Sequence, residues 1–196
     1  LDVRIKLRPV ESAYLHGDTL RTRNLDETLE AVIGHDLEFD YAVAWIDCVT
    51  GGRSLGRSVL LRARPAALAE LPEKLRGSPF ARRRPLPLKV PFHWPNSVLN
   101  PLVMRLANKS YYTRHRTREA LIGYDRYFYP LDTIGKWSRI YGRRGVLQYQ
   151  LVLPIDTCRA GLVEVVAKVN ASGMASFLAV LKSTGPSNEG PLSFPI

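Results

Sequence analysis

The amino-acid sequence predicts an α+β fold, with a mostly antiparallel sheet backed by helices. Short segments alternate apolar and polar residues, as strands do, and longer segments place apolar residues three or four positions apart, as amphipathic helices do. In order, these segments are strand, helix, strand and strand, then a less regular stretch that contains one helix, and then strand, helix, strand, helix and strand. The 196 residues suffice for one domain with a buried hydrophobic core.

The first half of the sequence contains three expected strands and one helix. Residues 1–16 alternate apolar and charged side chains and predict a strand with its continuation. A helix is expected between Asn24, a suitable N-cap, and Gly34, a suitable end. Residues 39–47 are almost continuously apolar and predict a central strand, and residues 58–64 predict the strand that returns beside it.

The middle of the sequence is less regular. Residues 65–95 include seven prolines, which exclude a continuous helix, so we expect an extended and partly mobile segment there. A helix is expected over residues 97–112, a strand over residues 122–129 and a short helix over residues 132–141.

Polar side chains interrupt an apolar strand pattern nearer the C-terminus. Residues 147–153 predict a strand that places Gln148 and Gln150 together on one face. Two amides on a covered face are typical of a binding surface, although a cross-strand hydrogen bond would also explain Gln148. A helix over residues 157–171 and a strand over residues 176–182 complete the pattern.

The positive charge is concentrated in the middle third of the chain. Residues 53–118 contain fifteen Lys and Arg against two acidic residues, or +13, whereas the remainder has thirteen against sixteen, or −3. A concentrated basic surface favours an anionic partner, which is a nucleic acid, anionic lipid headgroups or a phosphorylated substrate. The alternative is a solvated loop region without a specific partner.

Several kinds of site and segment have no signal in the sequence. No signal peptide is visible, and no apolar run approaches the roughly 18 residues of a membrane span. Cys48 and Cys158 lie 110 positions apart and are expected to be buried thiols in a reducing compartment, rather than a disulfide or metal ligands. P-loop, dinucleotide-binding and zinc-protease motifs are absent, and no metal site is expected. The loop at residues 51–57 is explained as a turn, because it lacks the lysine of a P-loop.

Seven short segments recur, in the same order, in a known enzyme family. They span nearly the whole chain: Ala44–Asp47, Gly52–Ser58, Tyr129–Asp132, Ile140–Gly142, Leu147–Gln150, Ser176–Leu178 and Pro191–Pro195. Through them the chain resembles FAD-linked oxidases of the vanillyl-alcohol oxidase class, and within that class the decaprenylphosphoryl-β-D-ribose 2′-oxidases. The resemblance implies that residues 1–196 form the substrate-binding cap domain of a longer flavoprotein whose N-terminal FAD-binding domain is absent here. Residues 65–118 would be a basic, proline-rich and mobile insertion in that cap.

The resemblance also assigns five residues to a substrate pocket, namely Trp45, Tyr129, Gln148, Gln150 and Lys182. Lys182 matches a lysine near the flavin, where a fixed cation holds a substrate oxygen or stabilises negative charge as it develops. Trp45 lies on the strand that supplies an aromatic wall. Tyr129 is the best match for the pocket tyrosine, and Tyr127 is the alternative. The catalytic base and the cofactor-binding residues are not assigned.

The activity implied by the resemblance is FAD-dependent oxidation of a sugar hydroxyl. The expected substrate is the 2′-hydroxyl of a polyprenylphosphoryl ribose, a precursor of cell-wall arabinan, which becomes a ketone as a hydride passes to the flavin. FAD would be held mainly by the missing N-terminal domain, so the fragment is expected to be inactive alone. The implied partners are the lipid-phosphate sugar, a ketoreductase and a membrane surface contacted by residues 53–118. The implied location is the cytoplasm or the periphery of the inner membrane.

Two other functions remain open from the residues. An aldonolactone or alditol oxidase of the same fold would act on a soluble sugar and have no membrane affinity. A non-catalytic basic module would bind nucleic acid through residues 82–84 and 109–118, with Tyr111 and Tyr112 as stacking surfaces. That module would leave the two glutamines unexplained, so nucleic acid is not the expected partner.

Overall fold

The main sheet is antiparallel throughout. The computed structural model describes residues 2, 4, 6–34, 39–81, 88–174, 176 and 178–184. The strands of the sheet are β1 (Tyr14–Thr22), β2 (Tyr41–Ile46), β3 (Ser58–Pro65), β5 (Arg118–Gly123) and β7 (Ala179–Leu181). They lie in the order β5-β1-β3-β2-β7, and each neighbouring pair is antiparallel. The prediction of an α+β fold with a mostly antiparallel sheet is confirmed.

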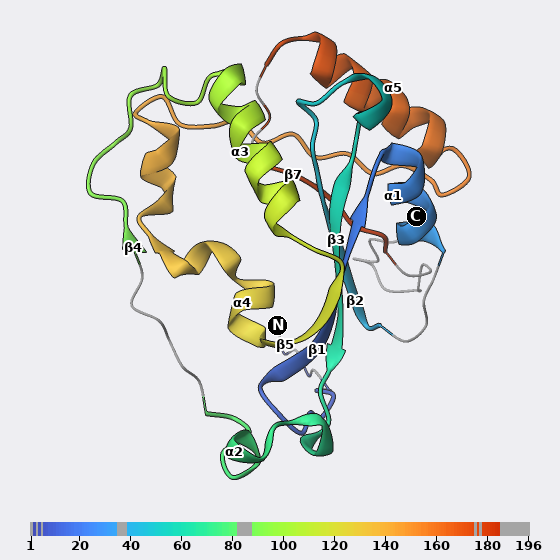
Figure 1. The fold of residues 1–196 in the computed structure, drawn as a ribbon, viewed down its shortest axis with the longest axis vertical. Coiled ribbons are helices and arrows are strands. Elements are labelled where there is room, and N and C mark those ends of the chain that lie inside the picture. The colour runs from blue at the N-terminus through green and yellow to red at the C-terminus, as the bar shows by residue number, and fades with distance from the viewer. Residues whose placement is uncertain are drawn as a thin grey trace.

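Helices cover both faces of this sheet. The α-helices are α1 (Leu25–Ile33), α2 (Glu73–Arg76), α3 (Pro101–Arg114), α4 (Tyr124–Phe128) and α5 (Cys158–Ala171), and the 3-10 helices are η1 (Gly52–Ser54), η2 (Leu68–Glu70), η3 (Pro130–Thr133) and η4 (Trp137–Tyr141). In Figure 1 the sheet is seen nearly edge-on, with α1 and α5 on one side and α3 and α4 on the other. Within the described part of the chain, no helix has the length and apolar character to cross a membrane.

The helix α1 begins and ends where the sequence predicts. The side-chain oxygen of Asn24 accepts a hydrogen bond of 2.9 Å from the Glu27 backbone N–H, which satisfies one of the free donors of the first turn. At the other end, the Gly34 N–H donates to the Glu30 carbonyl. Asp26 and Glu27 lie in the first turn, where carboxylates interact favourably with the helix dipole.

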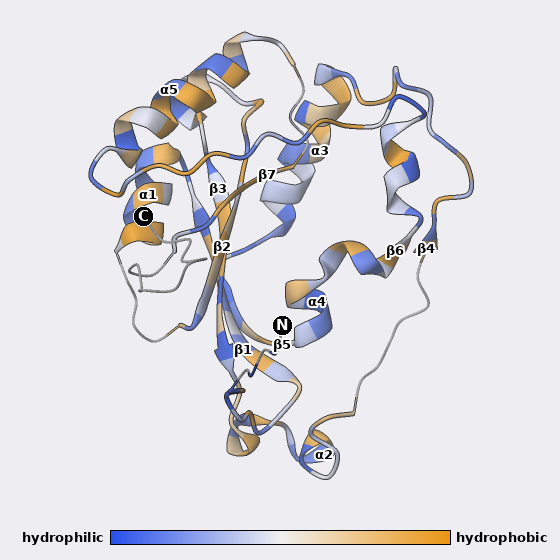
Figure 2. Ribbon diagram, turned by 180° about the vertical axis from the view of Figure 1, so that it is seen from behind, coloured by the Kyte–Doolittle hydropathy of each residue, from blue (hydrophilic) through white to orange (hydrophobic). Residues whose placement is uncertain are grey.

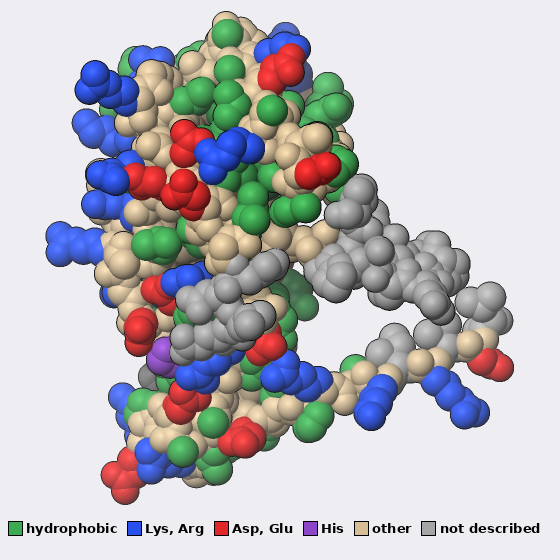
Figure 3. Space-filling view, turned by 90° about the vertical axis from the view of Figure 1, so that its right-hand side faces the viewer, with side chains coloured by type: hydrophobic (Ala, Val, Ile, Leu, Met, Phe, Trp, Pro, Cys, Tyr) green, Lys and Arg blue, Asp and Glu red, His purple; other side chains and the backbone are tan. Residues whose placement is uncertain are grey.

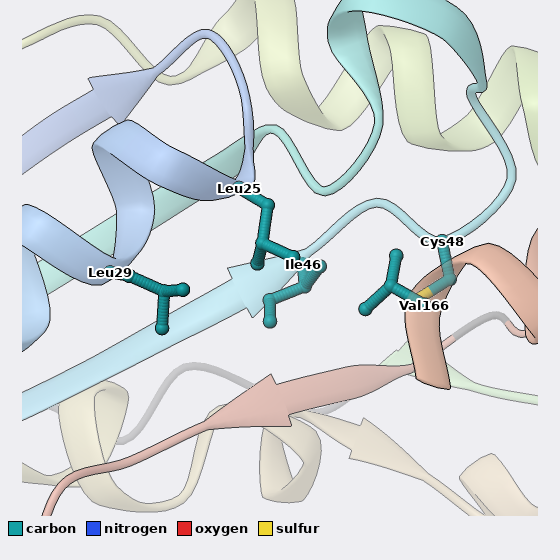
Figure 4. Packing of buried hydrophobic residues seen from close by; sticks show 5 residues of the cluster. All are labelled: Leu25, Leu29, Ile46, Cys48 and Val166. Atoms are coloured by element: carbon teal, nitrogen blue, oxygen red, sulfur yellow. The ribbon is translucent and has the colours of Figure 1, made fainter. Parts of the chain in front are cut away.

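The core lies between the sheet and the helices α1 and α5. Leu25 and Leu29 of α1 pack with Ile46, Cys48 and Val166, which Figure 4 shows converging from α1, β2 with the loop after it, and α5. Figure 2 shows hydrophobic residues on both helices. Both cysteines are buried and free, as predicted, and burial, with a smaller effect of the neighbouring Asp47 carboxylate, raises the pKa of Cys48 to about 11.

The outward sides of α1 and α5 are typical of a solvated surface. Lys and Arg side chains are interspersed there with Asp and Glu (Figure 3). Arg159 of α5, for example, forms ion pairs with Asp26 and Glu30 of α1. Because positive and negative side chains alternate here, the electrostatic potential over this side of the molecule does not have a single sign.

A second, smaller substructure joins two distant segments of the chain. The strands β4 (Leu88–Lys89) and β6 (Ile134–Gly135) pair in parallel. Arg139 donates hydrogen bonds to the carbonyls of Val90 (3.1 Å) and Pro91 (2.5 Å), which ties η4 to the same segment. Gly142 follows with φ of 70°, and a Cβ at this position would collide with the Asn96 side chain.

Two strand predictions are wrong. A strand was expected over residues 122–129, but β5 ends at Gly123 and Tyr124–Phe128 form α4, so Tyr129 follows a helix. A strand was also expected over residues 147–153, but this segment has no regular secondary structure. Alternation is a local signal, whereas a strand also needs a neighbour that accepts and donates its backbone hydrogen bonds, and β7 is not paired with this segment.

Several other helices and strands begin or end at residues that differ from the predicted ones, for local reasons. The first strand begins at Tyr14 rather than in residues 1–16 as a whole, and the last covers only Ala179–Leu181 within the described residues. The helix α3 begins at Pro101 because the Asn100 side chain accepts hydrogen bonds from the backbone N–H groups of Leu102 and Val103, both at 3.0 Å. The single helix expected over residues 132–141 is instead the pair η3 and η4, separated by β6.

Candidate functional site

The two faces of the sheet contact different helices. Because side chains alternate along a strand, Ala44 and Ile46 face α1 and α5, whereas Trp45 faces α3 and α4. Val59 and Val180 lie directly opposite Trp45 on the neighbouring strands and therefore share its face. We call this side the α3 face. It includes Val43, Trp45, Val59, Leu61, Ala63 and Val180.

Trp45 anchors α3 to the sheet. Its side chain is buried, and its ring centroid lies 4.6 Å from that of Tyr111, which in turn lies 4.1 Å from that of His115. The His115 ring nitrogen Nδ1 lies 2.9 Å from the Tyr111 carbonyl oxygen. Burial raises the pKa of the Tyr111 hydroxyl, which keeps it neutral. The three rings form one aromatic stack from β2 to the end of α3.

Asp47, directly after β2, holds three segments together. Its carboxylate is fully buried and accepts hydrogen bonds from the Asn108 amide at 2.9 Å, from Arg57 Nε at 2.9 Å and from the Thr50 hydroxyl at 2.7 Å. Burial alone would raise the pKa of Asp47, but the hydrogen bonds from Thr50, Asn108, Val49 and Arg57 outweigh it and hold the pKa below its usual range. The carboxylate is therefore charged and fixes α3 over the end of β2.

Among the residues that the structure describes, none covers the corner of the α3 face at β2 and β7. Val180 is 49% exposed although it lies opposite the buried Trp45, and Leu178 is 52% exposed. Strand alternation places Leu178, Val180 and Lys182 on one side of this segment. Lys182 directly follows β7 and is exposed. The corner is thus an apolar surface beside the buried Trp45, with a cation at its end.

The two candidate tyrosines have different environments. Tyr127 donates a hydrogen bond of 3.1 Å from its hydroxyl to the Leu61 carbonyl, and burial, with a smaller effect of Tyr41, raises its pKa. Tyr129 is 53% exposed and lies 6.4 Å from Phe128, measured between ring centroids. Tyr127 therefore packs α4 on the α3 face, whereas the Tyr129 side chain is accessible.

The structure does not bring the two glutamines to the corner. Gln148 and Gln150 are exposed in the irregular segment between η4 and α5, which Figure 1 shows as an extended trace running across the view toward α5. Leu147 and Tyr149 beside them are 98% and 85% exposed. Among the described residues, no hydrogen bond or ring contact joins either glutamine to Trp45. Likewise, the described part of the chain gathers no group of three or more His, Cys, Asp or Glu side chains as a metal site.

Comparison with known proteins agrees with the resemblance in the sequence. No protein-family model matches the chain. The chain is 34% identical over 198 aligned residues to "Decaprenylphosphoryl-beta-D-ribose oxidase" of Mycolicibacterium smegmatis. It is similar to this oxidase from end to end. The alignment includes all of this chain but 43% of the mycobacterial protein, so the chain spans less than half the length of the curated relative that it matches.

The similarity to the decaprenylphosphoryl-beta-D-ribose oxidase extends through every element of the sheet, because the alignment leaves no part of this chain out. The segments that contain Trp45, Tyr129 and Lys182 therefore all lie within the matched region. Trp45 lies on β2 and Lys182 directly follows the neighbouring strand β7, whereas Tyr129 comes from the junction of α4 and η3.

Two residues near the site were missed in the sequence. Asn108 falls within the helix expected over residues 97–112 and was not singled out, although an Asn inside a helix is unfavourable unless its side chain has a partner, and this was the available signal. Tyr112 was considered as a stacking surface. Its hydroxyl donates to the Thr22 carbonyl at 3.0 Å, a contact between residues 90 positions apart that no local pattern indicates.

Proposed function

We propose that this chain is the substrate-binding part of an FAD-dependent oxidoreductase that oxidises the 2′-hydroxyl of a polyprenylphosphoryl ribose to a ketone. The observation that carries the proposal is the 34% identity, along the entire chain, to an oxidase named for decaprenylphosphoryl ribose. The uncovered apolar corner beside Lys182 supports it, because a sugar-binding site needs an accessible surface with a few fixed polar groups.

The residues of the corner have distinct proposed roles. Trp45 lies buried beneath the apolar surface on which the substrate packs, and its ring contact with Tyr111 keeps that surface rigid. Lys182 binds a substrate oxygen and stabilises negative charge that develops on it. Tyr129 donates a hydrogen bond to the sugar or its phosphate. Gln148 and Gln150 reach the same sugar when their exposed segment lies over the corner.

The apolar side chains of Val43 and Val180, on the α3 face, would hold part of the flavin of a bound FAD. A bound FAD supplies the hydride acceptor of the reaction, while the residues of this chain bind and orient the sugar. The remainder of the cofactor would be held by an N-terminal domain outside residues 1–196, which makes this chain a cap domain.

The proposal is tested with the full-length natural protein. We expect it to contain FAD and to lose visible flavin absorbance, without added oxidant, when polyprenylphosphoryl ribose is supplied. Bleaching by a soluble aldonolactone or alditol instead would support the alternative oxidase of the same fold. A protein that purifies without flavin and takes up none would overturn the proposal.

The same proposal includes contact with a membrane, because the substrate is lipid-linked. Leu102 and Leu106 lie one turn apart on α3 and are 66% and 60% exposed, and the exposed cations Arg105 and Lys109 lie among them. Exposed leucines with cations beside them on a helix can enter the boundary between lipid headgroups and acyl chains. We propose that the basic residues 53–118 dock there, at the periphery of the inner membrane, and that a ketoreductase consumes the ketone product.

Vesicle sedimentation tests this docking. The double substitution Leu102→Gln and Leu106→Gln should weaken binding to anionic vesicles about tenfold, because it removes apolar area that would enter the interface. The substitution Val163→Gln is the control, since Val163 is 42% exposed on α5 and lies outside residues 53–118. Unchanged binding of the double variant would contradict docking through α3.

A further inference from the structure

A basic hollow opens at the end of the sheet, between α1, η1 and α3. Its volume is about 540 Å³. The residues that line it are Arg23, Asn24, Glu27, Arg53, Ser54, Arg57 and Tyr112. The lining therefore carries three guanidinium groups and one carboxylate.

The wall formed by Arg57 and Tyr112 is held in place. Arg57 is anchored by the buried Asp47 carboxylate, with Nε 2.9 Å and Nη2 2.8 Å from Oδ2. Its guanidinium lies 4.5 Å from the centroid of the Tyr112 ring, and that of Arg21 lies 4.8 Å from the same centroid. The Tyr112 hydroxyl donates to the Thr22 carbonyl. The side chains of Arg57 and Tyr112 are therefore already fixed, and ligand binding would not have to order them.

Glu27, the one acidic residue of the lining, is already satisfied. Its carboxylate accepts a hydrogen bond of 2.8 Å from the Arg23 backbone N–H and one of 2.6 Å from Arg23 Nε. The side-chain hydrogen bond with Arg23 holds the pKa of Glu27 below its usual value. Glu27 is thus charged but paired with Arg23, and Asp47 is paired with Arg57, so Arg53 is the guanidinium of the lining that has no carboxylate partner among the described residues.

Three donors of the hollow have no acceptor within the described residues. Arg53 has no ion-pair partner there, and the Ser54 hydroxyl makes no hydrogen bond there. Asn24 uses its side-chain oxygen for the α1 cap, which leaves its NH₂ group without a described acceptor. Donors in excess of acceptors, in a hollow with net positive charge, match an oxyanion with several acceptor atoms.

We propose that this hollow binds a phosphate group, either a free phosphate ester or the headgroup of an anionic lipid. Guanidinium groups suit phosphate because their planar donors match its oxygens, and the Ser54 hydroxyl and Asn24 amide add donors at the same opening. The site differs from the corner at β2 and β7, since none of its lining residues lies on the α3 face of the sheet. The proposed site also assigns the loop at residues 51–57 a function in ligand binding, in addition to its function as a turn.

Binding of inorganic pyrophosphate and of vesicles to the full-length natural protein tests the proposal. Calorimetry would measure pyrophosphate, and sedimentation would compare phosphatidylcholine vesicles with and without phosphatidic acid. Arg53→Gln should weaken phosphate binding about tenfold, because a charge-assisted hydrogen bond is lost. Ser54→Ala should weaken it about threefold. Both side chains lack described hydrogen bonds, so neither change removes a contact that holds the fold.

Arg126→Gln is the matched control, because Arg126 is an exposed arginine on α4, away from the hollow. Loss of pyrophosphate binding in Arg53→Gln but not in Arg126→Gln would support the site with free phosphate as a ligand. The same pattern with phosphatidic acid vesicles alone would support it with a lipid headgroup as the ligand. Equal losses in both variants, or binding of neither probe by the wild type, would overturn it.

Discussion

Replacing Asp47 with alanine should lower the free energy of unfolding by about 3 kcal/mol, because it leaves the largely buried guanidinium of Arg57 without its partner. The side chains of Asp47 and Arg57 are 0% and 15% exposed, so solvent replaces the lost contact only in part. The change also removes the acceptor of the Asn108 amide, which is buried within α3. Urea unfolding followed by circular dichroism measures the effect.

Asp40→Ala is the control for this experiment. Asp40 also pairs with an arginine, Arg8, but the Arg8 side chain is 69% exposed, and exposed pairs contribute little to stability. The midpoint of unfolding should therefore move far less than for Asp47→Ala. Equal shifts in the two variants would show that the buried network around Asp47 does not stabilise the fold.

The contribution of Asp47 should also depend on pH. Its folded pKa lies below the unfolded value of about 3.9, so its charge stabilises the fold above that pH. The stabilisation is lost as the pH falls from there through the folded pKa. The difference in unfolding free energy between the wild type and Asp47→Asn should be constant above about pH 5 and shrink below about pH 4. A difference that is independent of pH would mean that Asp47 is neutral in the folded protein.

The parts of the fold that follow local rules were predictable. The N-cap Asn24, the end at Gly34 and the apolar stripe between them specify α1 within the sequence itself. Residues 147–153 show the limit of such rules. Their alternation is as regular as that of a real strand, but pairing depends on a neighbour far along the chain, and Leu147 is 98% exposed as a result.

The candidate site was predictable only in part, for a related reason. The alternation of β2 separates Trp45 from Ala44 and so places its ring on one face, but which helix covers that face does not follow from alternation. The contact from Asn108 to Asp47 joins residues 61 positions apart. Long-range contacts of this kind decide where α3 lies, and they leave the β7 side of the α3 face open.

Replacing Lys182 with alanine should reduce the rate at which the substrate bleaches the flavin by about 10²–10³-fold, with flavin content unchanged. The reason is that the cation at the end of β7 stabilises charge that develops on a substrate oxygen, while the cofactor is held elsewhere. Gln148→Ala should have a smaller effect, because it removes one neutral hydrogen bond worth about 1 kcal/mol. Stopped-flow absorbance of the full-length protein measures both rates.

Lys168→Ala is the control for Lys182, because Lys168 is an exposed lysine of α5 that pairs with Glu164 on the opposite side of the sheet. The substrate should bleach the flavin of the Lys168→Ala variant at the wild-type rate. Lys182→Arg keeps the charge but changes its geometry, so a rate between those of Lys182→Ala and the wild type would indicate that position as well as charge matters. If Lys182→Ala bleaches at the wild-type rate, the corner at β2 and β7 does not bind the reacting sugar, even if the full-length protein is an FAD-dependent oxidase.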